Sequence, residues 1–217
     1  MSDPFSVALS LGPLSVYLIV IGLMQSGRKP VVTTGAQDTA ALGIGVSGFL
    51  MIGPLVLFFP TMAYGVLGWI VWAMLTAFYL LTLLLIILTM RPRMVIYGLD
   101  AGQVRAPMLR AAQSIDPDAK MEGEQIWFPS VGCSIRLDMI NAGDVPQIVP
   151  QIQQISPRFW RRLLEAMRRE VSTFENRNRS RGLGIVFVGT LMMILIASNM
   201  VSHPQEVVAG FRHWLRL

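Results

Sequence analysis

Four long stretches without a charged side chain constrain this chain more than any other feature. They cover residues 5–24, 40–62, 65–90 and 183–202, and none contains Asp, Glu, Lys, Arg or His. About 20 residues of α-helix cross the ~30 Å hydrocarbon core of a bilayer, and a charge at its centre costs about 2.5–3.5 kcal/mol. Because only 14% of the residues are charged and 53% are hydrophobic, a wholly soluble protein is excluded and four transmembrane helices are predicted.

The second stretch carries small residues at helical spacing. Ala41 and Gly45 are four positions apart, as are Gly43 and Ser47, and Gly48 follows directly. Small residues at this spacing let two helix backbones approach closely in a membrane. We therefore expect the second span to pack on another helix through these five residues.

Basic residues near the span ends fall mainly on one side of the four spans. Ten of them lie in the 25–39 loop and the 91–182 segment, against Arg212 and Arg216 on the other side. Basic flanks favour the cytoplasm. Residues 91–182 are therefore expected to be cytoplasmic, with both termini outside.

The 91–182 segment is long enough for a small domain and shows strand patterns. Strands are expected over 94–99, 125–128 and 134–139, since these stretches are apolar or alternate between apolar and polar residues. The turn sequence Pro129-Ser-Val-Gly joins the last two strands and predicts a hairpin.

Helix signals lie between and after these strands. Asp100 and Gln103 have the spacing of a capping box and predict a helix toward Ile115. Ser156 followed by proline predicts the start of an amphipathic helix with an apolar face from Phe159 to Phe174. Prolines interrupt the apolar series over 145–155, so a broken or short helix is expected there.

The expected fold is therefore an α-helical integral membrane protein with four transmembrane helices. A small α+β domain of order β-α-β-β-α lies between the third and fourth helices. The tail over 203–217 is expected to form an interfacial helix on the outer face. Its apolar residues at spacings of three and four are Val207, Val208, Phe211, Trp214 and Leu215.

Four short motifs within residues 94–138 occur in an order that resembles uncharacterised multi-pass membrane proteins of planctomycete-type bacteria. They are Tyr97-Gly-Leu, Leu109–Ala112, Ile115-Asp-Pro-Asp-Ala and Ile126-Trp-Phe-Pro. The resemblance implies a location in a bacterial inner (plasma) membrane. It implies no function.

Positive charge is concentrated just before the last span. Residues 158–181 hold eight arginines and three glutamates, which gives 8 − 3 = +5. An arginine run just before a membrane helix favours a topology signal and contact with anionic lipid headgroups over nucleic acid, which we do not expect as a partner. The candidate contacts are Arg161, Arg162, Arg168, Arg169, Arg177, Arg179 and Arg181.

Residue types that carry catalysis or bind metals are scarce. The single cysteine, Cys133, suits a small buried side chain, and both histidines lie in the 203–217 tail. The acidic loop over 116–124 lacks the glycine and closing glutamate of a calcium loop, which favours a solvated turn. No catalytic residue, cofactor or metal is expected.

These observations lead to two hypotheses. The first is a non-enzymatic bacterial inner-membrane protein whose cytoplasmic domain mediates partner binding or self-association. The alternative is an accessory subunit of a transporter or channel, because charge-free spans are compatible with a passive path, although they disfavour a proton-driven carrier.

Overall fold

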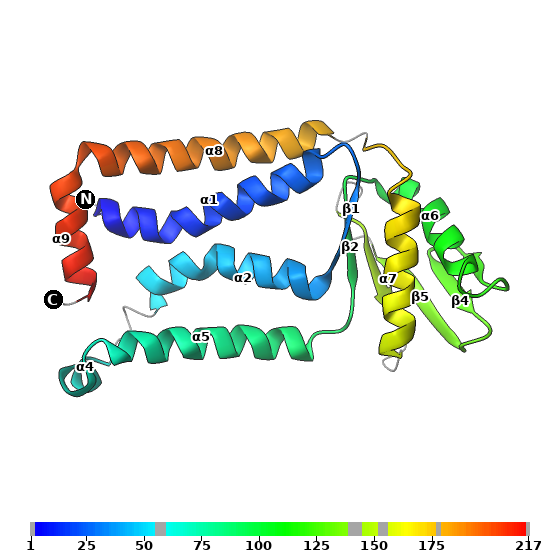
Figure 1. Ribbon diagram of the computed structural model, residues 1–217, viewed down its shortest axis with the longest axis horizontal. Coiled ribbons are helices and arrows are strands. Elements are labelled where there is room, and N and C mark those ends of the chain that lie inside the picture. Colours follow the sequence, from blue (N-terminus) through cyan, green and yellow to red (C-terminus); the bar gives the residue numbers. More distant parts are fainter. Residues whose placement is uncertain (1–2, 55–59, 139–144, 152–155, 177–178, 216–217) are drawn as a thin grey trace. The chain divides into compact units, whose positions relative to one another are not determined.

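The computed structural model describes residues 3–54, 60–138, 145–151, 156–176 and 179–215 of the 217-residue chain (Figure 1). The chain divides into two compact units. The helical unit comprises Met1–Val20, Thr39–Thr89 and Ile185–Leu217, and the α+β unit comprises Ile21–Asp38 and Met90–Gly184.

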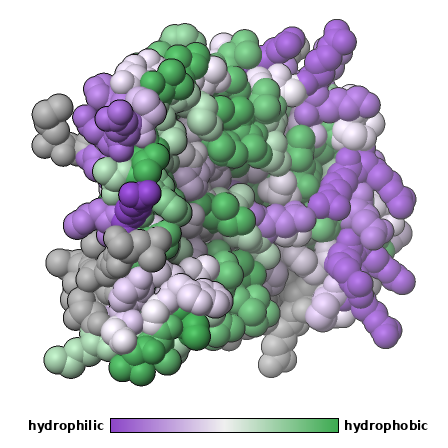
Figure 2. Space-filling model, turned by 60° about the vertical axis from the view of Figure 1, so that its left-hand side comes forward, coloured by the Kyte–Doolittle hydropathy of each residue, from purple (hydrophilic) through white to green (hydrophobic). Residues whose placement is uncertain are grey.

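Three of the described helices are long and apolar enough to cross a membrane. They are α1 (Pro4–Ser26), α5 (Ile70–Thr89) and α8 (Arg179–Ser202). Large apolar side chains on these helices are exposed, among them Phe78 and Phe187, at 68% and 67%. Figure 2 shows broad apolar areas on the molecular surface. This surface fits lipid better than water.

The second predicted span corresponds to α2 (Gly35–Ile52), which is not among these three helices. It begins before the predicted boundary at residue 40, and its first turn contains Asp38. Residues 55–59 of the predicted span lie outside the described residues.

The prediction of one helix over 65–90 is wrong at its start. A short helix, α4 (Thr61–Leu67), ends at Gly68, whose backbone N–H donates to the Tyr64 carbonyl at 2.8 Å. Gly68 has φ +56°, a left-handed conformation that glycine adopts at low energy. Residues 63 and 64, which separate the second and third predicted spans, are therefore helical, and α5 starts only at Ile70.

The helix expected in the tail is present as α9 (Pro204–Leu215). The Trp214 ring lies 4.1 Å from the Trp72 ring, and the Tyr64 hydroxyl donates to the Leu215 carbonyl at 2.7 Å. These contacts fix α9 against the start of α5 and against α4. Its location at a membrane surface stays a prediction.

The α+β unit is built on one antiparallel six-stranded sheet of order β1-β2-β6-β5-β4-β3. The strands are β1 (Val31–Thr34), β2 (Met94–Tyr97), β3 (Lys120–Glu122), β4 (Gln125–Phe128), β5 (Cys133–Asp138) and β6 (Gln147–Pro150). The helices are α6 (Ala101–Gln113) and α7 (Pro157–Val171).

The three predicted strands correspond to β2, β4 and β5, and the predicted hairpin is confirmed by the pairing of Phe128 with Cys133. The capping box at Asp100 and Gln103 is also present.

The β-α-β-β-α order is nevertheless incomplete, because it omits β1, β3 and β6. The broken helix expected over 145–155 is wrong over Gln147–Pro150, which forms a strand between β2 and β5. Residues 152–155 of this prediction lie outside the described residues. Hydrogen-bonded pairing of β6 with a strand on each side outweighs the helical spacing of its apolar residues, because the segment is too short for a stable helix.

Helices α6 and α7 cover one face of this sheet (Figure 1). The Phe128 ring on β4 meets the Phe159 ring on α7 edge-on at 5.1 Å between centroids. The apolar face predicted for α7 thus packs onto the sheet. The fully buried side chains of this core include Met94, Val104, Met108, Ile126, Ile135, Leu137, Ile148, Leu163 and Met167.

Candidate binding surfaces

The arginine-rich side of α7 faces solvent. Helical periodicity buries Leu163 and Met167 in the core and leaves Arg161, Arg162 and Arg169 exposed on the other side. These three arginines carry five N–H donors each and form an exposed cationic surface.

The other predicted lipid contacts are less uniform. Arg168 is exposed but its Nε donates to the Val32 carbonyl on β1 at 3.2 Å, so it also ties α7 to the sheet. Arg179 and Arg181 are exposed in the first turn of α8, and Arg177 lies outside the described residues. Contact of these side chains with lipid stays a prediction.

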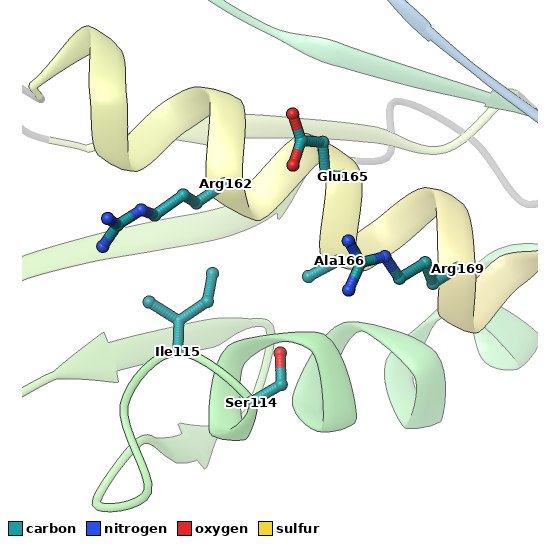
Figure 3. Close-up of a pocket in the computed structure, with 6 residues that line it drawn as sticks. All are labelled: Ser114, Ile115, Arg162, Glu165, Ala166 and Arg169. Carbon is teal, nitrogen blue, oxygen red and sulfur yellow. The ribbon is translucent and has the colours of Figure 1, made fainter.

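A hollow of about 280 Å³ lies between α7 and the end of α6 (Figure 3). Its lining residues are Ser114, Ile115, Arg162, Glu165, Ala166 and Arg169. The Ser114 hydroxyl donates to the Ala111 carbonyl at 2.7 Å and closes the helix end. Because the carboxyl end of a helix carries partial negative charge, Arg162 and Arg169 complement α6, and the hollow needs no ligand to explain its arginines.

A polar network joins the start of α2 to the sheet. The Tyr97 hydroxyl donates to Asp38, and Arg93 Nη2 lies 3.5 Å from the Asp38 carboxylate. Arg93 Nη1 also donates to the Gln147 side chain at 3.3 Å. A Cβ at Gly35 would lie 2.2 Å from Arg93 Cγ, so any larger residue there would displace the Arg93 side chain. No sequence pattern predicts this network, because Asp38 stands alone in the 25–39 loop.

Asp116 is buried, which corrects the expectation that the whole 116–124 loop is solvated. The residue is 1% exposed, and its carboxylate accepts hydrogen bonds from the Ser130 N–H at 2.9 Å, the Ser130 hydroxyl at 2.8 Å and the Asp118 N–H at 3.2 Å. Burial alone raises the pKa of Asp116, but these three donors outweigh it and hold the pKa below its ordinary range. Asp116 therefore fixes the loop after α6 to the β4–β5 hairpin.

Cys133 is 5% exposed at the start of β5. Burial, and secondarily the charge of Asp116, raise the pKa of its thiol. Since the thiolate is the nucleophile, this environment suits a structural cysteine.

The opposite face of the sheet from α6 and α7 is exposed over β3, β4 and β5. We define this open face by six side chains: Lys120, Glu122, Gln125, Trp127, Arg136 and Asp138. Trp127 is 46% exposed. Strand register places Lys120 beside Trp127, and places Gln125 between Glu122 and Arg136. The six side chains make no hydrogen bond or ion pair with the described part of the chain, so they are available to a partner.

The small residues of α2 lie between α1 and α5. A Cβ at Gly45 would be 2.8 Å from the Tyr17 Cβ, and one at Gly48 would be 2.1 Å from the Leu9 carbonyl oxygen. On the other side, a Cβ at Gly43 would lie 2.6 Å from Leu83 Cδ1.

The remaining two small residues contribute less to this packing. Ala41 is half-buried, and the Ser47 hydroxyl donates to the Ile44 carbonyl of its own helix at 2.7 Å. Tyr79 on α5 donates its hydroxyl to the Gly43 carbonyl at 2.6 Å.

Among the described residues, no group of three or more His, Cys, Asp or Glu side chains is placed to hold a metal ion. No protein-family model, curated protein or solved structure matches this chain.

Proposed function

We propose that this chain is a non-enzymatic, multi-pass membrane protein whose α+β unit binds a protein partner or a second copy of the chain. The open face carries this proposal. Its tryptophan and four charged side chains are exposed on rigid strands, while the other face of the same strands is closed by α6 and α7. Tryptophan and arginine are the residues that most often dominate protein interfaces.

The membrane part of the proposal has four spans, with α2 as the fourth beside the three longer helices. Close approach of Gly45 and Gly48 to α1 supports this, because a glycine-rich helix is tolerated in lipid when a neighbouring helix covers its backbone. The bias of basic residues favours the α+β unit in the cytoplasm and the termini outside a bacterial inner membrane.

Anionic lipid is a second proposed partner. The exposed side chains of Arg161, Arg162 and Arg169 have no ion pair among the described residues, which leaves their charge available to phosphate groups. This contact would hold α7 beside the lipid headgroups. The three arginines take no part in the core of the α+β unit.

Site-specific photo-crosslinking in native membranes tests the proposal. A photoreactive side chain at Gln125 should form an adduct with protein, since Gln125 is at the centre of the open face. The same probe at Gln113, exposed at the end of α6, is the matched control and should give none.

A probe at Phe78 on α5 separates the alternative function. An accessory subunit of a transporter or channel would give protein adducts at Phe78 rather than at Gln125, because its spans would contact the main subunit. Absence of any protein adduct at Gln125 would contradict the proposed function.

A further inference from the structure

The open face has a charge pattern that is complementary to itself. We infer that it forms the contact surface of a homodimer about a two-fold axis that runs close to the direction of β4. This inference rests on the proposed function and names its partner as a second copy. The same face carries two positive side chains, Lys120 and Arg136, and two negative ones, Glu122 and Asp138.

The strand register determines what meets across such an axis. β3 and β5 flank β4, so a rotation about β4 lays β3 of one copy over β5 of the other. Glu122, Gln125 and Arg136 occupy one row across the three strands. Glu122 of each copy therefore faces Arg136 of the other copy, and Gln125 faces its own equivalent.

The neighbouring row supplies the apolar contact. It contains Lys120, Trp127 and Ser134. Rotation about β4 brings the two Trp127 rings together. Lys120 lies over the strand position of Ser134, which is buried and whose hydroxyl donates to the Gln151 side chain at 3.0 Å. Two aromatic side chains at the centre and charge pairs around them reproduce the usual arrangement of an interface core and rim.

Sheet twist is compatible with these contacts. Sheets pack ~10 Å apart, and aligned sheets cross at roughly −30°. β3 and β5 each lie one strand spacing, about 4.8 Å, from the axis. At that distance the crossing angle displaces facing residues on these strands by roughly 2.4 Å along the strand direction. Glutamate and arginine side chains are long enough to cover that offset.

The charge balance favours a second copy over other partners. A surface for nucleic acid or an acidic protein would carry excess positive charge, whereas the open face carries two charges of each sign. Two-fold contacts require a patch that matches itself, which Glu122 on β3 and Arg136 on β5 provide.

Charge reversal tests the inference on the full chain in detergent. In Glu122→Arg, position 122 meets Arg136 of the other copy, and in Arg136→Glu, position 136 meets Glu122. Each variant alone thus has two like-charge pairs, and its dimer dissociation constant should rise about tenfold or more. Light scattering coupled to size exclusion measures the mass.

Mixing the two variants tests directly whether position 122 of one copy meets position 136 of the other. A Glu122→Arg chain beside an Arg136→Glu chain restores an arginine–glutamate pair at both contacts, so the mixture should form heterodimers that differently tagged chains reveal. Glu165→Arg is the control, because Glu165 is exposed on α7, which covers the face of the sheet opposite the open face. It should dimerise like the unmodified chain. Melting curves establish that each variant is folded.

Several results would overturn the inference. They are an unmodified chain that is monomeric at all concentrations, a dimer insensitive to both reversals, or folded variants that fail to pair when mixed. Protein adducts at Gln125 with a chain other than a second copy would overturn the dimer and leave the proposed function standing. A monomer without any adduct at Gln125 would contradict both.

Discussion

Replacing Gly48 with alanine should destabilise the helical unit, because the added methyl group has no room beside α1. The Cβ would lie 2.1 Å from the Leu9 carbonyl oxygen and 2.6 Å from that of Ser10, whereas ordinary contacts begin at 3.4 Å. Both atoms belong to backbone, so side-chain rotation cannot relieve the overlap. The two helices would have to separate by more than an ångström.

The size of the effect follows from comparison with a matched glycine. A methyl group added at Gly184 in α8 would meet no atom within 4 Å, so Gly184→Ala only gains the ~1 kcal/mol by which alanine favours a helix. Gly48→Ala has the same gain and also an overpacking penalty of about 1–3 kcal/mol. At about 2–4 °C per kcal/mol, the melting temperatures of the two variants should differ by roughly 2–12 °C.

Thermal melting of the full chain in detergent, followed by circular dichroism, measures this difference. Gly43→Ala should fall between the two, since its methyl group meets the end of the flexible Leu83 side chain at 2.6 Å. Equal melting temperatures for the Gly48 and Gly184 variants would refute the close approach of α1 and α2.

Three further predictions concern the α+β unit. Asp116 has a lowered pKa, so its contribution to stability is present above the ordinary carboxyl pKa of about 3.9 and is lost as the pH falls through the lowered pKa. Asp116→Asn should therefore reduce the loss of stability at acid pH, measured by urea unfolding at each pH. An unchanged loss of stability would contradict this prediction. Cys133 should react with maleimide at pH 7.5 only after unfolding, because burial shields the thiol and raises its pKa. Rapid labelling of the folded chain, detected by mass spectrometry, would contradict this prediction. Changing Arg161, Arg162 and Arg169 together to glutamine should reduce the number of phosphatidylglycerol molecules that the chain retains in native mass spectrometry. Arg136→Gln, the control on the sheet, should leave that number unchanged. Equal retention by both variants would contradict a lipid-binding role for α7.

Several elements of the α+β unit were predictable because their sequence signals are local and strong. The alternation of Ile135 and Leu137 with Arg136 identifies β5, and all three have the expected burial. The capping box of α6 and the apolar stripe of α7 each span more than one helical turn, so neighbouring residues reinforce the same prediction.

The missed strands have too few residues for a periodic signal. Val31–Thr34 consists of β-branched residues, which favour strands, but its place between two spans suggested a simple loop. Gln147–Pro150 becomes a strand through pairing with β2 and β5, whose residues lie elsewhere in the chain. The open face and the burial of Asp116 likewise depend on register and on contact with Ser130, which no local pattern encodes.

The pairing of β1 with β2 has a consequence for biosynthesis. Val32 pairs with Ile96, which is 96 − 32 = 64 positions later in the chain. At synthesis rates of about 5–20 residues per second, β1 has to wait roughly 3–13 s for its partner strand. Throughout that interval, α2 and α5 leave the ribosome while the edge of β1 has no strand to pair with. Pairing of β1 with β2 can thus begin only after α2 and α5 have been synthesised, and slow elongation between residues 34 and 94 should increase exposure of β1 to chaperones and proteases.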